Sequence, residues 1–168
     1  EKINEYAVKG FRVLLFAKSK SVISDDKVPS PFTPLSIIVL EDNLRKDAYQ
    51  TVKWFNENRV RIKVISGDNP ITVAEVSKRV NIPDCDKYIS LEGKTDEEVK
   101  ALANEYTVFG RVSPEQKAIL IKAIKEAGHV TAMTGDGVND LLALKEADCA
   151  ITVASGSDAA RKVSHLVL

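Results

Sequence analysis

The chain has 168 residues, enough to bury a substantial core in one domain, and its 44% hydrophobic and 29% charged residues exclude a disordered or fibrous protein. Its 24 basic and 24 acidic side chains cancel, which leaves no bulk positive field to attract nucleic acid or an anionic membrane. No apolar run approaches the roughly 20 residues that span a bilayer, the start lacks the pattern of a signal peptide, and the separated Cys85 and Cys149 argue against a disulfide framework or a zinc site.

Short β-branched runs alternate with segments of helical spacing along most of the chain. Strands are predicted at 12–17, 35–40, 61–65, 107–112, 129–134, 149–153 and 166–168. Helices are predicted at 47–58, 70–80 and 141–147. Two more are predicted to begin after the capping boxes at Thr95 and Ser113. Trp54 and Phe55 are expected in the core or at an edge that meets a partner. The alternation predicts an α/β fold, a parallel sheet with helices on both faces.

The first part of the chain departs from this alternation. Residues 19–34 are rich in Ser, Asp and Pro and join the first two predicted strands without a helix. We therefore expect residues 1–41 to be a short antiparallel remnant of a different unit and residues 42–168 to form the parallel-sheet domain.

The strongest chemical signal is Thr-Gly-Asp-Gly-Val-Asn-Asp at residues 134–140, between a predicted strand and a predicted helix. Ligands bind at the carboxyl ends of strands in such sheets. Asp136, Asn139 and Asp140 offer the hard oxygen ligands that Mg²⁺ selects. A lone Asp-Gly is more often a helix start, where an acid favours the dipole, but the whole heptapeptide in this context predicts a magnesium site.

Two weaker signals complete a possible phosphate site. Ser66 and Gly67, before Pro70, offer a hydroxyl and an amide to a phosphoryl oxygen, although such residues are also common in ordinary turns. Lys117 lies in the first turn of a predicted helix, where the dipole disfavours a cation unless an anion is bound nearby; taken alone it is typical of a surface lysine. Together these groups suit phosphoryl transfer, which needs positioning, charge neutralisation and a nucleophile.

These motifs together resemble those of a known family. The heptapeptide, continued by residues 141–148, resembles the hinge motif of P-type cation-transporting ATPases, membrane pumps whose phosphorylation domain has the haloacid-dehalogenase, Rossmann-like fold. Residues 66–68 are similar to their Thr-Gly-Asp motif with Ser in place of Thr, residues 111–117 to their lysine-bearing segment, and residues 40–45 to the exit from the nucleotide-binding domain. Residues 141–142 are Leu-Leu where the family usually has Ala-Pro.

The resemblance implies roles for the site residues. Asp136 would bind Mg²⁺, with Asp140 supporting the metal site, and Asn139 would touch the phosphate. Lys117 would neutralise an acyl phosphate whose oxygens the turn at 66–67 would hold.

The same resemblance implies a nucleotide interface, with ATP as the substrate and Mg²⁺ as the cofactor. Asp42, Arg45 and Arg111 lie where the family meets nucleotide, and Asp68 lies at the same mouth. Residues 1–41 would be the last strands of the nucleotide-binding domain.

One motif of the family does not occur in these residues: the Asp-Lys-Thr-Gly-Thr whose aspartate accepts the phosphate. The resemblance therefore implies that these residues are a cytoplasmic portion of a bacterial-type plasma-membrane pump. This portion would be inactive alone. Its partners would be the acceptor strand, the nucleotide-binding and actuator domains and the transmembrane helices. The acceptor strand would lie between the strands at 63–65 and 131–133, whose inner edges would be unpaired.

Two other functions stay open. A soluble haloacid-dehalogenase-type phosphatase shares the Gly-Asp-Gly-x-Asn-Asp signal, and its nucleophile would have to be Asp42, after the strand at 35–40. A non-catalytic interaction module with a relict magnesium site is the second alternative. The transported ion stays open too, although residues 139–142 suggest a bacterial-type pump for a divalent cation such as Ca²⁺.

Overall fold

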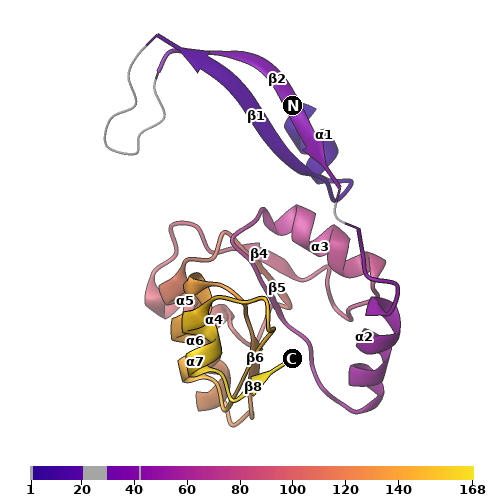
Figure 1. Cartoon of the computed structure of the whole chain (residues 1–168), viewed down its shortest axis with the longest axis vertical. Helices are drawn as coiled ribbons and strands as arrows, with labels where there is room; N and C mark the ends of the chain where they lie inside the picture. The colour runs from indigo at the N-terminus through magenta and orange to yellow at the C-terminus, as the bar shows by residue number, and fades with distance from the viewer. Residues whose placement is uncertain (1, 21–29, 42) are drawn as a thin grey trace.

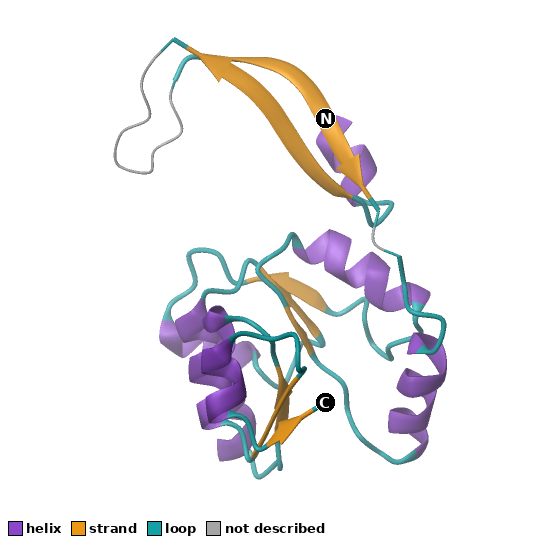
Figure 2. Ribbon diagram, in the orientation of Figure 1, coloured by secondary structure: helices purple, strands orange, loops and turns teal. Residues whose placement is uncertain are grey.

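A computed structural model describes residues 2–20, 30–41 and 43–168 (Figures 1 and 2). The helices are α1 (Lys2–Ala7), α2 (Ala48–Glu57), α3 (Pro70–Arg79), α4 (Asp96–Leu102), α5 (Pro114–Glu126), α6 (Leu141–Glu146) and α7 (Asp158–Val163), with a 3₁₀ turn η1 (Val138–Asp140). The strands are β1 (Arg12–Ser19), β2 (Phe32–Leu40), β3 (Val64–Ile65), β4 (Tyr88–Ser90), β5 (Val108–Gly110), β6 (Ala132–Thr134), β7 (Cys149–Thr152) and β8 (Leu166–Val167). No helix in the described ranges is long and apolar enough to cross a membrane.

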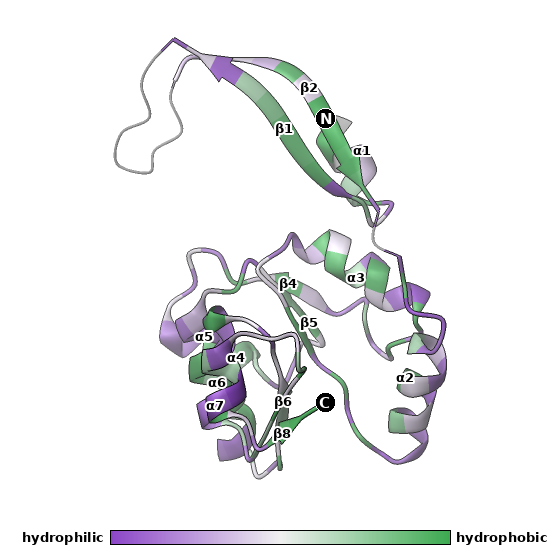
Figure 3. Ribbon diagram, viewed as in Figure 1, coloured by the Kyte–Doolittle hydropathy of each residue, from purple (hydrophilic) through white to green (hydrophobic). Residues whose placement is uncertain are grey.

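The amino-terminal part is an antiparallel hairpin, as predicted, preceded by a short helix that was not predicted. Strand β1 pairs with β2, with Arg12 opposite Leu40, and the hairpin projects from the rest of the chain (Figure 1). Both strands carry apolar residues, green along the ribbon in Figure 3. Several of their side chains are exposed, among them Phe16 and Leu35. Arg79 of α3 anchors the base, because its guanidinium donates to the Lys9 carbonyl at 2.6 Å and pairs with Glu41 at 3.5 Å.

The remaining strands form two separate parallel sheets, in the orders β3-β5-β4 and β6-β7-β8. Within the described residues, β3 pairs only with β5 and β6 pairs only with β7, so β3 is an edge strand of the first sheet and β6 is an edge strand of the second. Ile65 of β3 packs against the hydrophobic clusters of both sheets, which places the sheets next to each other. This arrangement matches the two unpaired inner edges that the family resemblance implied.

Helices cover both faces of the first sheet because side chains alternate along β5. Phe109 is fully buried against α4 and α5, whereas Val108 faces α3 and packs on Val73. Helix α5 also joins the two sheets, since Leu120 belongs to the first cluster and Ile121 to the second. Burial of each such side chain is worth about 1.5–3 kcal/mol, so α5 is held firmly between the sheets.

The predicted helix starts are confirmed in their details. Thr95 accepts from the Glu98 amide at 3.3 Å while Glu98 accepts from the Thr95 amide at 2.9 Å, which is a complete capping box. Ser113 and Gln116 form the same reciprocal pair at 3.3 and 3.1 Å. Such caps satisfy amides that the helix itself leaves free.

The prediction for Trp54 was wrong as far as the core is concerned. Helix α2 forms at 48–57, but it has no buried residue, and Trp54 is 58% exposed. Helical spacing of apolar residues predicts which face could be buried, but burial also requires a neighbouring element. Strand β4 and helix α7 were missed because each is short, and the predicted strand at 61–65 is reduced to Val64–Ile65.

Asp148 ties the start of β6 to the start of β7 and makes stability depend on pH. Its carboxylate accepts hydrogen bonds from the Thr131 amide at 2.8 Å and from the Thr131 hydroxyl at 3.1 Å. The hydrogen bond from the amide is the main cause that lowers the pKa of Asp148. A lowered pKa means that the stabilisation is full above the unfolded-state value, near 4, and is lost as pH falls through the folded-state value.

We therefore expect Asp148→Asn to unfold at lower urea concentration than the wild type at pH 6, with the gap between the two closing as the pH approaches 2. Urea denaturation at both pH values measures this. A gap of constant size across the range would show that Asp148 ionisation contributes nothing.

Candidate functional site

The turn after β3 is fastened to the turn after β5 by backbone hydrogen bonds. The Ser66 amide donates to the Phe109 carbonyl at 2.9 Å, and the Val112 amide donates to the Ser66 carbonyl at 3.1 Å. The Arg111 amide donates to the Asp68 carbonyl at 2.9 Å. Ser66 Oγ accepts from the Asp68 amide at 3.1 Å, so its own proton is directed elsewhere. The two turns form one unit.

This unit has tight packing and a strained residue. A Cβ on Gly110 would lie 2.5 Å from the Pro70 nitrogen, so only glycine lets β5 end against the first turn of α3. Arg111 follows with φ of 53°, in the left-handed region that costs a non-glycine residue roughly 1–2 kcal/mol. Strain of this kind persists where surrounding contacts fix the backbone and is concentrated at functional sites.

Lys117 reaches from the first turns of α5 to the turn after β6. Its Nζ donates to Asp140 Oδ1 at 2.7 Å, and each side chain is only 13% exposed. The anion that the sequence required near Lys117 is therefore present within the chain itself. The ammonium is therefore fixed in place by one carboxylate.

Asp140 organises the acidic turn at 135–140. Its second oxygen, Oδ2, accepts from the Gly137 amide at 3.3 Å. A Cβ on Gly135 would lie 2.6 Å from the Asp140 Cβ and 2.7 Å from its Cγ, so the turn closes directly on this side chain. Both carboxylate oxygens of Asp140 are thus engaged, whereas Asp136 is exposed, and no ion pair or side-chain hydrogen bond of Asp136 is found among the described residues.

The donor set fits Mg²⁺ held jointly with a phosphate. In the described part of the chain there is no group of three His, Cys, Asp or Glu side chains that could hold a metal alone. Mg²⁺ is commonly bound by one or two carboxylates, with water and phosphate oxygens as the remaining ligands. The Asp136 carboxylate meets that requirement, and Asp140, paired with Lys117, is better placed to orient the turn than to contact the ion.

Three turns therefore meet at one edge of the two sheets. They follow the carboxyl ends of the parallel strands β3, β5 and β6, where ligands bind in such folds. The hydrogen bond between Val112 and Ser66 joins the first two turns, and the ion pair between Lys117 and Asp140 joins the second to the third.

Some of the other predicted site residues lie on the three turns, and others do not. Gly67 and Asn139 are exposed on their turns, and Asp68 pairs with Arg12 of the hairpin at 3.6 Å. Arg45 is bound to Asp47 at 3.1 Å, a hydrogen bond that lowers the pKa of the Asp47 carboxyl, and no contact ties Arg45 to the three turns within the described residues. Asp42 lies outside the described residues.

Sequence reasoning missed Arg12. It lies at the start of β1, 56 positions before its partner Asp68, and pairs with that residue at the mouth of the site. No local pattern links the two residues, because the contact exists only once the hairpin docks on α3. The basic residue at the start of an apolar strand was the one available signal.

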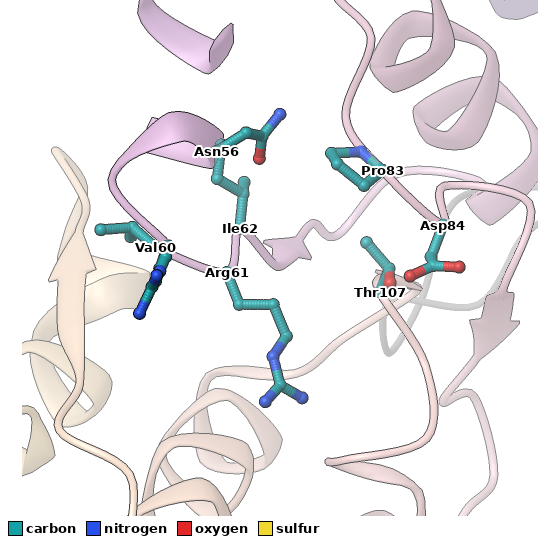
Figure 4. A pocket seen from close by; sticks show the side chains of 8 residues that line it. Asn56, Val60, Arg61, Ile62, Pro83, Asp84 and Thr107 are labelled. Atoms are coloured by element: carbon teal, nitrogen blue, oxygen red, sulfur yellow. The ribbon is translucent and has the colours of Figure 1, made fainter. Parts of the chain in front are cut away.

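A separate hollow of about 290 Å³ lies by the amino-terminal ends of the strands in the first sheet, opposite the candidate site (Figure 4). Its lining comes from segments that precede β3, β4 and β5: Asn56, Arg59, Val60, Arg61, Ile62, Pro83, Asp84 and Thr107. Because the candidate site lies beyond the carboxyl ends of the same strands, the hollow is not part of it.

Next to this hollow, Lys63 is partly buried without a carboxylate partner among the described residues. Its Nζ donates to the Tyr106 carbonyl at 2.5 Å. Burial of the ammonium, with a smaller contribution from Arg61, lowers the pKa of Lys63 to about 8. The unfolded chain keeps this proton to higher pH than the folded chain does, so the free energy of unfolding should gain a positive contribution as pH rises above 8.

We expect Lys63→Met to abolish that contribution. The difference in free energy of unfolding between wild type and Lys63→Met should move in favour of the wild type from pH 7 to pH 9.5, as urea denaturation measures it. Lys53→Met alters an exposed lysine of α2. The difference in free energy of unfolding between the wild type and Lys53→Met should stay constant over this pH range. Parallel pH profiles for all three proteins would contradict the assignment.

Comparisons with known proteins give a consistent result. A hydrolase family model, described as haloacid dehalogenase-like hydrolase, matches residues 5–148. The chain is 44% identical over 162 residues to the probable cation-transporting ATPase exp7 of Streptococcus pneumoniae serotype 4, covering 95% of this chain and 21% of that protein. It is 41% identical over 162 residues to the calcium-transporting ATPase CtpE of Mycobacterium bovis, covering 95% of this chain and 20% of that protein.

Solved structures agree on the architecture. The catalytic domain of the CPx-ATPase CopB-B matches with a TM-score of 0.58 at 25% identity, covering 80% of this chain and 43% of that one. A zinc-transporting PIB-type ATPase in the E2.Pi state matches with a TM-score of 0.62 at 24% identity, covering 97% of this chain and 21% of that one. The α/β fold with flanked parallel sheets is therefore the fold of such domains, and the chain spans about a fifth of the length of the curated relatives quoted above.

Proposed function

The chain belongs to the haloacid dehalogenase-like hydrolase family, and we propose that it is part of the phosphorylation domain of a P-type cation-transporting ATPase. In this proposal it supplies the hydroxyl–amide turn, the lysine and the magnesium ligand of an aspartyl-phosphate site. The observation that carries the proposal is the convergence of the three turns, linked through Ser66 and through the 2.7 Å pair of Lys117 and Asp140.

Each group has a distinct task in phosphoryl transfer from ATP. The oxygen of the Ser66 hydroxyl already accepts a hydrogen bond from the Asp68 amide. The hydroxyl and the Gly67 amide each donate a hydrogen bond to a phosphoryl oxygen. Lys117, held by Asp140, neutralises charge that develops on the transferring group. Asp136 carries Mg²⁺, and the ion, when bound, neutralises phosphate charge and aligns donor and acceptor. Asn139 lies on the same turn and contacts the phosphate.

The acceptor aspartate has to come from another segment. The motif Asp-Lys-Thr-Gly-Thr does not occur in the sequence. The edges of β3 and β6 without partner strands among the described residues suit a strand inserted between the two sheets. The partners in this proposal are that strand and the remaining nucleotide-binding, actuator and transmembrane parts of a membrane pump, with this chain on the cytoplasmic side.

The hairpin bears on the phosphatase alternative. That alternative needs Asp42 to attack phosphate from the end of a parallel strand. Asp42 lies outside the described residues, but the strand before it, β2, pairs antiparallel with β1. Strand β2 therefore belongs to neither parallel sheet.

Reconstitution tests the proposal. We expect the chain alone to form no acid-stable, hydroxylamine-labile phosphate from Mg·ATP, because the acceptor is not among its residues. Adding the preceding segment of a related pump, with its Asp-Lys-Thr-Gly-Thr strand and nucleotide-binding domain, should restore labelling. Lys117→Met and Asp136→Asn should then lower labelling by at least about 100-fold.

The controls separate the alternatives. Lys53→Met, on the exposed surface of α2, should label like the wild type. Phosphatase activity of the chain alone would favour the soluble phosphatase, and a complemented chain that binds neither Mg²⁺ nor beryllofluoride would favour the non-catalytic module.

A further inference from the structure

The turn between β7 and α7, residues 153–157, contacts the acidic turn directly. The Ser157 amide donates to the backbone carbonyl of Asp136 at 2.8 Å. The Gly156 amide donates to the Val153 carbonyl, also at 2.8 Å, which closes this turn tightly. A residue about 20 positions away in sequence thus holds the main chain of the residue whose carboxylate is free to meet a metal.

Gly156 makes this approach possible. A Cβ on Gly156 would lie 2.8 Å from Thr152 Oγ1, 3.0 Å from the Val153 carbonyl oxygen and 3.2 Å from the Asp136 carbonyl oxygen. Two of these three atoms are main-chain atoms, which cannot rotate away as the end of a side chain can. Any larger residue would therefore separate the turn from Asp136 or rotate that peptide group.

Arg161 of α7 fixes the opposite side of the same turn. Its Nη1 donates to the Ala154 carbonyl at 2.7 Å and to the Gly156 carbonyl at 2.9 Å. The guanidinium also pairs with Asp158. One planar group that holds two carbonyls of the turn and a carboxylate leaves the turn little freedom.

We propose that Gly156, Ser157 and Arg161 position Asp136 for magnesium. The inference rests on the proposed function, because it takes Asp136 as the magnesium ligand. No side-chain contact holds the Asp136 carboxylate among the described residues, so the point from which this side chain extends depends on its main chain, which the hydrogen bond from the Ser157 amide holds. These three are positioning residues, since they act through Asp136 and not through contact with the ion. Partners of this kind typically change metal affinity by about 10- to 100-fold when they are removed.

Two substitutions at one position separate the amide from the hydroxyl. Ser157 has φ of −61°, which proline shares, and its Oγ caps α7 by accepting from the Ala160 amide at 3.2 Å. Ser157→Ala and Ser157→Pro both remove the cap, but only Ser157→Pro removes the N–H that binds Asp136. Mn²⁺ binding is measured on the chain complemented with the preceding segment of a related pump and beryllofluoride, from the electron paramagnetic resonance signal of the free ion, and is confirmed by Mg²⁺ competition. Thermal unfolding reports stability.

We expect both variants to unfold at similarly lowered temperatures. Ser157→Ala should bind Mn²⁺ within twofold of the wild type, and Ser157→Pro about tenfold more weakly. Equal Mn²⁺ affinity in the two variants would overturn the inference, because a purely structural role would affect both alike.

A second pair keeps the test decisive if Ser157→Pro does not fold. Arg161→Lys keeps the charge but loses the two-carbonyl grip, and should weaken Mn²⁺ binding by about three- to tenfold. Arg79→Lys is the matched control, since Arg79 also holds a main-chain carbonyl, that of Lys9, away from the acidic turn. Wild-type affinity in Arg161→Lys, or equal weakening in both, would contradict the proposal.

Asp136→Asn distinguishes failure of the positioning inference from failure of the proposed function. If Asp136→Asn binds Mn²⁺ as the wild type does, Asp136 is not the ligand and both are wrong. If Asp136→Asn loses binding while the Ser157 and Arg161 variants match their controls, only the positioning inference is wrong.

Discussion

Replacing Lys117 by methionine is expected to lower the free energy of unfolding by about 3 kcal/mol, because it leaves the buried Asp140 carboxylate without its cation. The pair is short, 2.7 Å, and each side chain is 13% exposed, so water does little to screen it. The Gly137 amide still binds Asp140 in the variant, which keeps the loss at the lower end of the usual 3–5 kcal/mol or so.

A double-mutant cycle isolates the pair. Asp140→Asn should also destabilise, since it leaves the Lys117 ammonium partly buried and uncompensated. The double variant should be more stable than the sum of the single losses predicts, by about 1.5 kcal/mol or more. Urea denaturation at pH 7 measures all four proteins.

An exposed pair serves as the control for this cycle. Lys53 and Glu57 on α2 lie 3.8 Å apart with both side chains 62% exposed, and Lys53→Met should cost less than about 0.5 kcal/mol. A loss in Lys117→Met as small as that in Lys53→Met would mean that the site is not organised around the Lys117–Asp140 pair.

The second large effect is expected at Gly110. Gly110→Ala would place a Cβ 2.5–2.6 Å from three atoms of Pro70, two of them main-chain atoms. Neither strand β5 nor the start of α3 can move without disturbing the turn at 66–69 between them. We expect a loss of about 3 kcal/mol in the free energy of unfolding, at the upper end of overpacking costs.

Gly67 provides a matched comparison within the same unit. A Cβ there meets no atom within 4 Å, and alanine retains the amide that the proposed site uses. Gly67→Ala should therefore unfold within about 0.5 kcal/mol of the wild type. Similar urea midpoints for the two glycine variants would refute the packing assigned to Gly110.

Local features of the fold could be predicted from sequence because neighbouring residues determine them. The capping boxes at Thr95 and Ser113 formed as predicted, since their donors and acceptors are three residues apart. Trp54 was expected in the core or at an edge that meets a partner, and it is not in the core, because spacing identifies an apolar face without showing whether a neighbour covers it. Strand β4, with three residues, is too short to show a periodicity.

The candidate site shows the same division. The turns around Ser66 and Asp136 could be predicted because Gly, Ser and Asp after an apolar strand have few alternatives. The pairing of Lys117 with Asp140 could not, since the residues are 23 positions apart and meet only when α5 packs beside β6. The contact between Ser157 and Asp136 uses main-chain atoms, which no residue type specifies.

The most direct test of the account is a crystal structure of the chain bound to the preceding segment of a related pump, with Mg²⁺ and beryllofluoride. We expect one beryllofluoride group on the inserted aspartate, in contact with Ser66 Oγ and Lys117 Nζ, with Mg²⁺ on the Asp136 carboxylate. A group bound away from these side chains, or Ser66 and Asp136 separated by more than about 15 Å, the span of four to five extended residues, would contradict it.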